Sequence, residues 1–187
     1  IMRHPHYIKH NRGSGTPQHC IFFDTETTGR VIDDTTIETT LSFGQACYLR
    51  RLKHGKWSAP KWTRFETVDA FWDFVAQWCK PKRRLYIFAH NLAFDLTQVR
   101  GFSILQASGW ECTSRIIGPK ILNLTYRKDG ASIRLVDTYN YYPMALTAIG
   151  EMVGLEKYGF PEESDTPEIW DSYCQRDVEI MVEAMQL

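Results

Sequence analysis

Two short runs that are apolar at every position constrain the fold of this chain more than any other feature of its sequence. They are Cys20–Phe23 and Leu85–Ala89, and each is followed closely by polar residues. Short runs of this kind are typical of strands buried inside a sheet rather than half exposed on it. Both runs therefore predict buried strands, and we expect the first to extend to Asp24.

Further strands and several helices are predicted around these two runs. Strand patterns cover residues 39–49, 56–65 around a turn at Gly55, 112–117, 121–127 and 132–136. Helical patterns or caps mark 67–79 with Thr67 as N-cap, 91–99, 143–152 with Gly154 as a stop, and about 168 to 187. The aromatic residues of the first helix recur at helical spacing, which favours core packing. Strands interleaved with helices indicate an α/β fold, a mixed β-sheet flanked by α-helices.

Length and charge add two expectations about organisation. With 187 residues, the chain predicts one domain over 20–187, preceded by a flexible, histidine-dotted N-terminal arm over 1–19. The net charge is zero, but residues 1–150 hold 20 Lys and Arg against 12 Asp and Glu, while residues 151–187 hold 2 against 10. A basic body suits a polyanion such as nucleic acid. The run Lys80–Arg84, together with Arg50, Arg51 and Lys53, either contacts phosphates or is solvated surface, and both interpretations stay open.

The cysteines and the hydropathy pattern indicate in which cellular compartment the protein is expected. The five cysteines are widely separated and never at C-x-x-C spacing, which argues against a disulfide framework and against a cysteine zinc site. No apolar run approaches the ~18 residues of a membrane span, and the polar N-terminal segment lacks the apolar core of a secretion signal. We therefore expect an intracellular, reducing compartment and no membrane partner.

Two acids follow the first apolar strand at a spacing of two. Side chains i and i+2 of a strand share one face, so Asp24 and Glu26 can converge just beyond the strand's carboxyl end. Hard oxygen ligands at this spacing suit Mg²⁺ or Mn²⁺. A D-x-E pair alone is more often a polar turn, so the interpretation depends on other acids.

A third acid follows the second apolar strand. Asp95 lies one turn into the helix that Asn91 is expected to cap, and Phe94 beside it is expected to anchor inward. Ligands gather beyond the carboxyl ends of adjacent strands in open α/β sheets, so Asp95 could meet the first two acids. The alternative role of Asp95, a first-turn acid that favours the helix dipole, stays open at this point.

A fourth acid lies on the last predicted helix. Tyr173 and Asp177 are four residues apart and so occupy one helical face, while Ile169, Val178 and Met181 are expected to mark the packed side nearby. A phenol one turn from a carboxylate could orient a water molecule while the carboxylate holds metal.

The ordered set Asp24-x-Glu26, Asn91-x-x-x-Asp95 and Tyr173-x-x-x-Asp177 resembles the three exonuclease motifs of the DEDD superfamily in its tyrosine-bearing branch, DEDDy. More narrowly, the segments FFDTETTG, AHNLAFDL and YCQRDVEI look like the 3′-to-5′ proofreading domain of family B DNA polymerases of the protein-primed type. The resemblance covers about residues 20–187.

This resemblance implies an RNase H-like fold and a metal-dependent 3′-to-5′ exonuclease that hydrolyses single-stranded DNA ends to nucleoside monophosphates. It implies that Asp24, Glu26, Asp95 and Asp177 hold two divalent ions, Mg²⁺ or Mn²⁺, and that Tyr173 positions the attacking water. It also implies substrate contacts, to the terminal nucleotides, the 3′ end or a phosphate, for Asn91, Phe94, Thr27 and Lys157.

Two alternatives remain beside this interpretation. The tyrosine branch also contains RNA-trimming enzymes, so a 3′-to-5′ exoribonuclease with the same metals is the first. The second is a non-catalytic module that binds nucleic acid or a protein partner, against which the full set of acids and the tyrosine argue. A polymerase does not fit within this length, so we expect either a proofreading-type domain with a linked polymerase domain or a free-standing nuclease.

Overall fold

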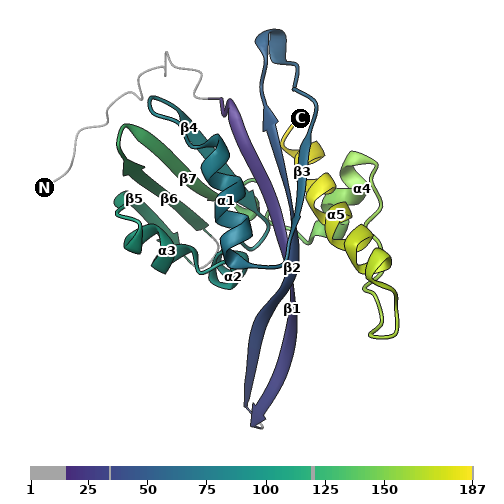
Figure 1. The fold of residues 1–187 in the computed structure, drawn as a ribbon. Coiled ribbons are helices and arrows are strands. Elements are labelled where there is room, and N and C mark those ends of the chain that lie inside the picture. The colour runs from purple at the N-terminus through teal and green to yellow at the C-terminus, as the bar shows by residue number, and fades with distance from the viewer. Residues whose placement is uncertain (1–15, 34, 119–120, 187) are drawn as a thin grey trace, which may run out of the picture.

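A computed structural model describes residues 16–33, 35–118 and 121–186, and within them seven strands form one sheet (Figure 1). The order across the sheet is β3-β2-β1-β4-β7-β6-β5. The strands are β1 His19–Asp33, β2 Thr36–Arg50, β3 Lys61–Phe65, β4 Arg84–Ala89, β5 Glu111–Gly118, β6 Ile121–Lys128 and β7 Ala131–Asp137. β4 runs parallel to both β1 and β7, and every other neighbouring pair is antiparallel. The predicted mixed sheet is therefore confirmed.

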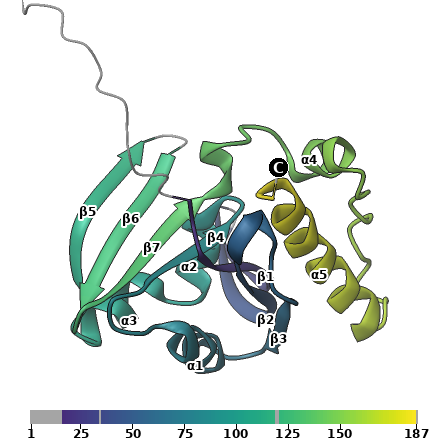
Figure 2. The same cartoon turned by 90° about the horizontal axis from the view of Figure 1, so that it is seen from above.

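Helices cover both faces of this sheet, as the view from above shows (Figure 2). They are α1 Val68–Trp78, α2 Leu92–Gln98, α3 Gly101–Ala107, α4 Leu146–Val153 and α5 Pro167–Ala184, with short 3₁₀ turns η1 Lys53–Gly55 and η2 Thr138–Asn140. α1, α2 and α3 lie on one face, while α5 lies on the other and packs on β1 and β2, with α4 beside it. This is the RNase H-like α/β architecture that the resemblance implied.

Alternation along β1 explains why its apolar run is buried on both sides. Phe23 packs with Phe71 of α1 in the larger hydrophobic cluster. Its neighbour Phe22 belongs to a second cluster with Val178 and Met181 of α5. Because consecutive side chains of a strand point to opposite faces, the run joins the two hydrophobic layers.

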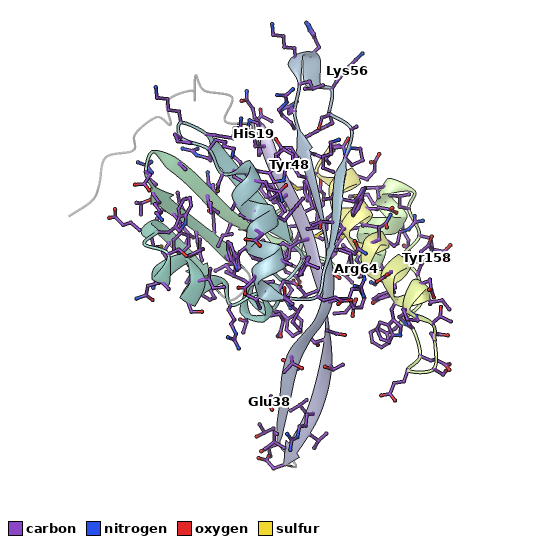
Figure 3. All side chains as sticks on the ribbon, viewed as in Figure 1. His19, Glu38, Tyr48, Lys56, Arg64 and Tyr158 are labelled. Atoms are coloured by element: carbon purple, nitrogen blue, oxygen red, sulfur yellow. The ribbon has the colours of Figure 1, made fainter. Side chains whose placement is uncertain are left out.

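β1 extends far beyond its predicted limits of 20–24, whereas β2 exceeds its predicted range of 39–49 by three residues at its start and one at its end. Their outer halves form a two-stranded ribbon that projects below the body in Figure 1, and Figure 3 marks Glu38 on it. Threonine and β-branched residues on both strands favour continued pairing even where little apolar surface is buried. Val31 and Ile37 on this ribbon are 71% and 64% exposed.

Several other boundaries differ from the predictions for local reasons. β3 begins at Lys61 rather than 56, because Trp57 pairs only in an isolated bridge with Arg51 and Pro60 has no N–H group to donate. α4 begins at Leu146 rather than 143, and α3 was not predicted. Thr67 caps α1 as expected, with its Oγ1 accepting a hydrogen bond from Ala70 N at 3.2 Å. The turn at Asp129 and Gly130 is confirmed, with both residues at positive φ.

Three other sequence predictions concern the arm, the cysteines and the membrane. Residues 1–15 of the predicted arm lie outside the described residues, and His19, its last residue, already belongs to β1. All five cysteines are free, which agrees with the predicted lack of a disulfide framework. Among the described residues, no helix combines the length and the apolar character needed to cross a membrane.

Candidate functional site

The carboxyl end of β1 places two acids on the face that α5 covers. The last residue of β1 that pairs with β4 is Phe22, opposite Phe88, so Asp24 lies just beyond the shared part of the two strands. Alternation puts Asp24 and Glu26 on the same face as Phe22. Directly after Glu26 the register with β2 shifts, which leaves Ser42 as an extra residue on β2. Bulges of this kind bend a strand and re-aim the side chains next to it.

Asp95 reaches the same region from α2. It is 2% exposed, and its Oδ1 accepts hydrogen bonds from Thr25 N at 3.1 Å and Thr25 Oγ1 at 2.6 Å. Thr25 stands between Asp24 and Glu26 on β1, so these bonds tie α2 to the strand that carries the first two acids. The helix buries Leu92 and Leu96 beside Asp95.

Of two predictions about the start of α2, the N-cap position of Asn91 is confirmed and the inward anchoring of Phe94 was wrong. Asn91 occupies the N-cap position with φ of 67°, but its side chain makes no capping hydrogen bond. Instead, the carboxylate of Asp137 at the end of β7 accepts hydrogen bonds from the backbone N–H groups of Asn91 and Leu92, both at 3.1 Å. Phe94 does not anchor inward, because the buried side of α2 falls on Leu92, Asp95 and Leu96 and leaves Phe94 41% exposed.

α5 brings three buried side chains to the same end of the sheet, which are Tyr173, Cys174 and Asp177. Val178 and Met181 pack beneath them as expected, but Ile169 is 46% exposed, so its predicted packing was wrong.

Lys157 joins this group from the loop between α4 and α5. Its ammonium group forms an ion pair with Asp177 and donates a hydrogen bond to the hydroxyl of Tyr173 at 3.0 Å. The loop passes close to α4 at Gly150, where an added Cβ would lie 2.4 Å from the carbonyl oxygen of Leu155. A glycine at this position lets the chain carry Lys157 back over the helix.

The pKa values show how closely the four acids interact. Burial raises the pKa of Asp24 well above its usual value, and the negative charges of Asp95, Asp177 and Glu26 raise it further. Burial also raises the pKa of Glu26 to about 7, with the charge of Asp177 adding to the effect and Lys157 opposing it. The charges of the other three acids thus disfavour ionisation of Asp24, and the charge of Asp177 disfavours ionisation of Glu26.

The other two acids have raised pKa values for the same first reason. Burial raises the pKa of Asp95 to about 7, although the hydrogen bonds from Thr25 act in the opposite direction. Burial raises the pKa of Asp177, and the hydrogen bond and charge of Lys157 offset part of this effect. Burial likewise raises the pKa of the Tyr173 phenol, so the hydroxyl keeps its proton at neutral pH.

Cys174 is part of the cluster, and sequence reasoning missed it. Its Sγ lies with one oxygen each of Asp24 and Glu26 in a group whose ligand atoms are all within 4.8 Å of one another. Burial and the charge of Asp24 raise the pKa of this thiol well above its usual value, so it remains protonated. It contacts Asp24 Oδ2 at 3.5 Å as a weak donor. Its helical spacing of three from Asp177 was the only available sign in the sequence.

These donors fit a hard divalent cation. Asp177 Oδ1 is buried and has no hydrogen-bond partner among the described residues, so one carboxylate oxygen of this acid is unsatisfied. Carboxylate oxygens are the ligands that Mg²⁺ and Mn²⁺ prefer, whereas a protonated thiol is not a ligand for either. Asp24 and Glu26 each offer a carboxylate oxygen to the group that could hold such an ion.

A hollow of about 440 Å³ opens beside Glu26. Thr27 lines it together with Phe43 of β2 and Trp170 of α5. Arg64 of β3 lies at its side, between β3 and α5 in Figure 3, and donates to Asp171 at 2.7 Å. Asn91 and Phe94 do not line this hollow; they stay exposed at the start of α2.

The fold and the acidic cluster together describe an RNase H-like α/β protein with a carboxylate-rich site at the carboxyl ends of its central strands. Solved structures of Phi29 DNA polymerase share this fold. The ternary complex with primer-template DNA and incoming nucleotide substrates has a TM-score of 0.60 at 18% identity, covering 91% of this chain and 30% of that chain. The complex with single-stranded DNA has a TM-score of 0.58 at 17% identity, covering 91% and 31%.

These similarities concern a part of the polymerase, because the chain spans less than a third of its length. At this level of identity they show the fold alone. No protein-family profile matches the chain, and no curated protein matches it.

Proposed function

We propose that this protein is a metal-dependent 3′-to-5′ exonuclease that removes nucleoside monophosphates from single-stranded DNA ends. The observation that carries the proposal is the meeting of four carboxylates around Asp24, with one oxygen of Asp177 buried and unpaired. Such a cluster is unfavourable by itself and becomes favourable when divalent ions balance its charge.

In this proposal Asp24, Glu26, Asp95 and Asp177 hold two divalent ions, Mg²⁺ or Mn²⁺. When bound, such ions supply an activated water molecule and stabilise the leaving oxygen of an in-line displacement at phosphorus. Thr25 keeps Asp95 oriented through two hydrogen bonds, and Cys174 contacts Asp24 as a weak donor.

Tyr173 and Lys157 act on the attacking water and the phosphate. The phenol stays protonated at neutral pH, so it can donate a hydrogen bond that orients the water. Burial lowers the pKa of Lys157, but its hydrogen bonds to Asp177 and Tyr173 and the charges of these groups together leave the pKa raised, so it remains a cation. It can then offset negative charge on the phosphate.

Substrate contacts fall to residues around the hollow and at the start of α2. Thr27 lines the hollow beside Glu26 and would contact the 3′ end. Asn91 and Phe94 are exposed next to Asp95, where an amide and an aromatic ring can hold terminal nucleotides by hydrogen bonding and stacking. The fold shared with Phi29 DNA polymerase supports DNA as the substrate, with a linked polymerase domain as a possible partner.

The test is a cleavage assay on a single-stranded DNA oligonucleotide labelled at its 5′ end. We expect a ladder that shortens from the 3′ end when Mg²⁺ or Mn²⁺ is present and no products with a chelator. A matched RNA oligonucleotide tests the alternative substrate, and faster loss of RNA would contradict the proposed DNA preference.

Variants identify the site. Asp24→Asn and Asp177→Asn should lower the rate by several orders of magnitude, because each removes a ligand charge, and each variant should still unfold in one cooperative thermal transition. Asp73→Asn, a change at an exposed acid on α1, is the matched control. Equal rates in all three variants, or no cleavage by the unaltered protein with either metal, would overturn the proposal.

A further inference from the structure

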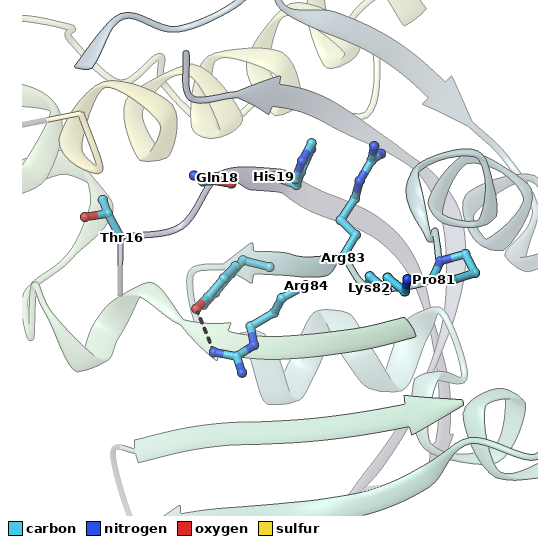
Figure 4. Close-up of a pocket in the computed structure, with 8 residues that line it drawn as sticks. Thr16, Gln18, His19, Pro81, Lys82, Arg83 and Arg84 are labelled. Carbon is cyan, nitrogen blue, oxygen red and sulfur yellow. Dashed lines mark hydrogen bonds between the residues drawn. The ribbon is translucent and has the colours of Figure 1, made fainter. Parts of the chain in front are cut away.

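The sheet is strongly basic along the line where its parallel strands begin, and this line is here called an edge of the sheet. The acidic cluster lies at the opposite edge, where these strands end. The amino ends of β1, β4 and β7 lie at this edge, together with the turn between α1 and β4 and the turn between β6 and β7. His19 and Asp24 are five residues apart on β1, so the two edges are separated by about 17 Å along the strand. Figure 4 shows one hollow of this edge, with Lys82, Arg83 and Arg84 on its rim.

Two adjoining hollows of about 500 and 440 Å³ share the turn between α1 and β4. The cations that line them, here called the basic edge, are Lys82, Arg83, Arg84, Arg127 and Lys128. The acids that line them are Glu111 and Asp129. Within the part of the chain that the structure describes, none of the five cations forms a salt bridge. Their charge is therefore available to an external anion.

Backbone hydrogen bonds hold the two turns of the basic edge together. Lys82 N donates to Gly130 O at 2.8 Å, and Ser132 N donates to Arg83 O at 3.1 Å. Lys82 adopts φ of 60°, a left-handed conformation that is unfavourable for a lysine and is maintained here by its neighbours. The cations are thus presented from a fixed backbone rather than from a free loop.

The positive charges at this edge shift the pKa of a neighbouring side chain, His19. Burial lowers the pKa of His19, and the charges of Arg83 and Arg50 lower it further. Arg50 ends β2 at the same edge, paired with His19, so the positive region continues past the two hollows.

We propose that the basic edge binds the phosphate backbone of a nucleic acid at a surface separate from the carboxylate cluster. Several cations on one concave, fixed surface match the regularly spaced charges of a polyanion. Large apolar side chains that could enter a lipid layer are missing from the exposed lining of both hollows, as far as these residues are described, which disfavours a membrane surface. The binding does not depend on cleavage.

A matched pair of double variants tests this surface. Lys82→Asn with Lys128→Gln removes two of its charges, and asparagine tolerates the positive φ at position 82. The control, Arg100→Asn with Arg115→Gln, removes two exposed charges elsewhere: Arg100 has φ of 51°, and Arg115 lies on β5. Each pair therefore removes two positive charges, one at a residue with positive φ and one on a strand.

The measurement is the affinity for a long single-stranded DNA oligonucleotide, by fluorescence anisotropy, across a range of salt concentrations with chelator present. Loss of two phosphate contacts should flatten the slope of log K against log salt by about 1.4, whereas the control should keep the original slope. Equal slopes in both variants would overturn the inference, as would tighter binding of phosphatidylserine vesicles than of DNA. The chelator prevents cleavage, so this measurement reports binding alone. A flattened slope in a protein that shows no nuclease activity would contradict only the proposed function and would leave the inference about the basic edge standing.

Discussion

Asp137 fixes the helix that carries Asp95, although it lies 42 positions further along the chain. Its carboxylate accepts hydrogen bonds from the backbone N–H groups of Asn91 and Leu92, and from that of Tyr139 at 2.9 Å. The first N–H groups of a helix lack partners within it, so a carboxylate there satisfies them and favours the helix dipole. One buried side chain thereby sets where α2 begins and where Asp95 points.

Asp137→Ala should therefore destabilise the protein. The substitution leaves buried N–H groups without partners, and we expect the free energy of unfolding to fall by about 1–3 kcal/mol. Chemical denaturation followed by circular dichroism measures this change, with Asp73→Ala as an exposed control. An unchanged midpoint for Asp137→Ala would mean that another group caps α2.

Residue spacing was enough to predict some of these roles and could not predict others. Asp24 and Glu26 share a face because of a periodicity that holds in any strand, and Tyr173 and Asp177 because of one that holds in any helix. Asp137 and Cys174 act through contacts with residues distant in sequence. The sequence around Asp137 does not distinguish it, and for Cys174 it offers only the spacing of three from Asp177, so both roles emerged from the folded chain.

At the scale of elements, fully apolar or clearly periodic segments were predicted well. β4, α1 and α5 lie close to their expected bounds because burial determines them. The ribbon formed by β1 and β2 was underestimated, because its outer half depends on cross-strand pairing rather than on a buried face. α3 was missed because it is only seven residues long and follows α2 through a break at Arg100, whose φ is 51°.

Gly44 on β2 shows how tightly these elements fit near the candidate site. A Cβ added there would lie 2.3 Å from Cζ of Phe65 and 2.6 Å from the carbonyl oxygen of Asp24. Gly44→Ala should therefore shift the end of β1 and lower stability by about 1–3 kcal/mol, as overpacking does. Nuclease activity, if present, should fall with it.

Gly29→Ala on the ribbon is the matched control for this prediction. An added Cβ would lie 3.3 Å from Cγ2 of Ile37, an exposed side chain that can move. Differential scanning calorimetry of both variants compares the two glycines directly. A Gly44→Ala protein that unfolds at the original temperature would contradict the close approach of β2 to Asp24.

The whole molecule separates its charges between two edges of one sheet. The carboxylates gather where the parallel strands end, and the cations of the basic edge gather where they begin. A net charge of zero conceals this polarity. The sequence predicted an excess of basic residues in the body but not their position, which depends on the order of strands in the sheet.

The carboxylate cluster should make the stability of the metal-free protein depend on pH. Glu26 and Asp95 have folded pKa values of about 7, against ordinary values of 4.5 and 3.8. An acid with a raised folded pKa contributes stability below its unfolded pKa and loses it as pH rises through the folded value. The unfolding temperature should therefore fall between about pH 4 and pH 7.

Divalent ions should reverse this loss. Millimolar Mg²⁺ should raise the unfolding temperature more at pH 8 than at pH 5, because the ions bind only the ionised carboxylates. A double variant, Glu26→Gln with Asp95→Asn, should remove most of both effects in thermal scans. An equal Mg²⁺ shift at both pH values, or an undiminished one in the double variant, would argue against ion binding at this cluster.

The contact between Cys174 and Asp24 joins residues 150 positions apart. Long loops close late in folding, because their entropy must be lost before the contact forms. During synthesis, β1 to β7 leave the ribosome before α5, so a growing chain carries Asp24, Glu26 and Asp95 without Tyr173 and Asp177. Any chemistry that requires the whole cluster therefore begins only after α5 has been made and docked.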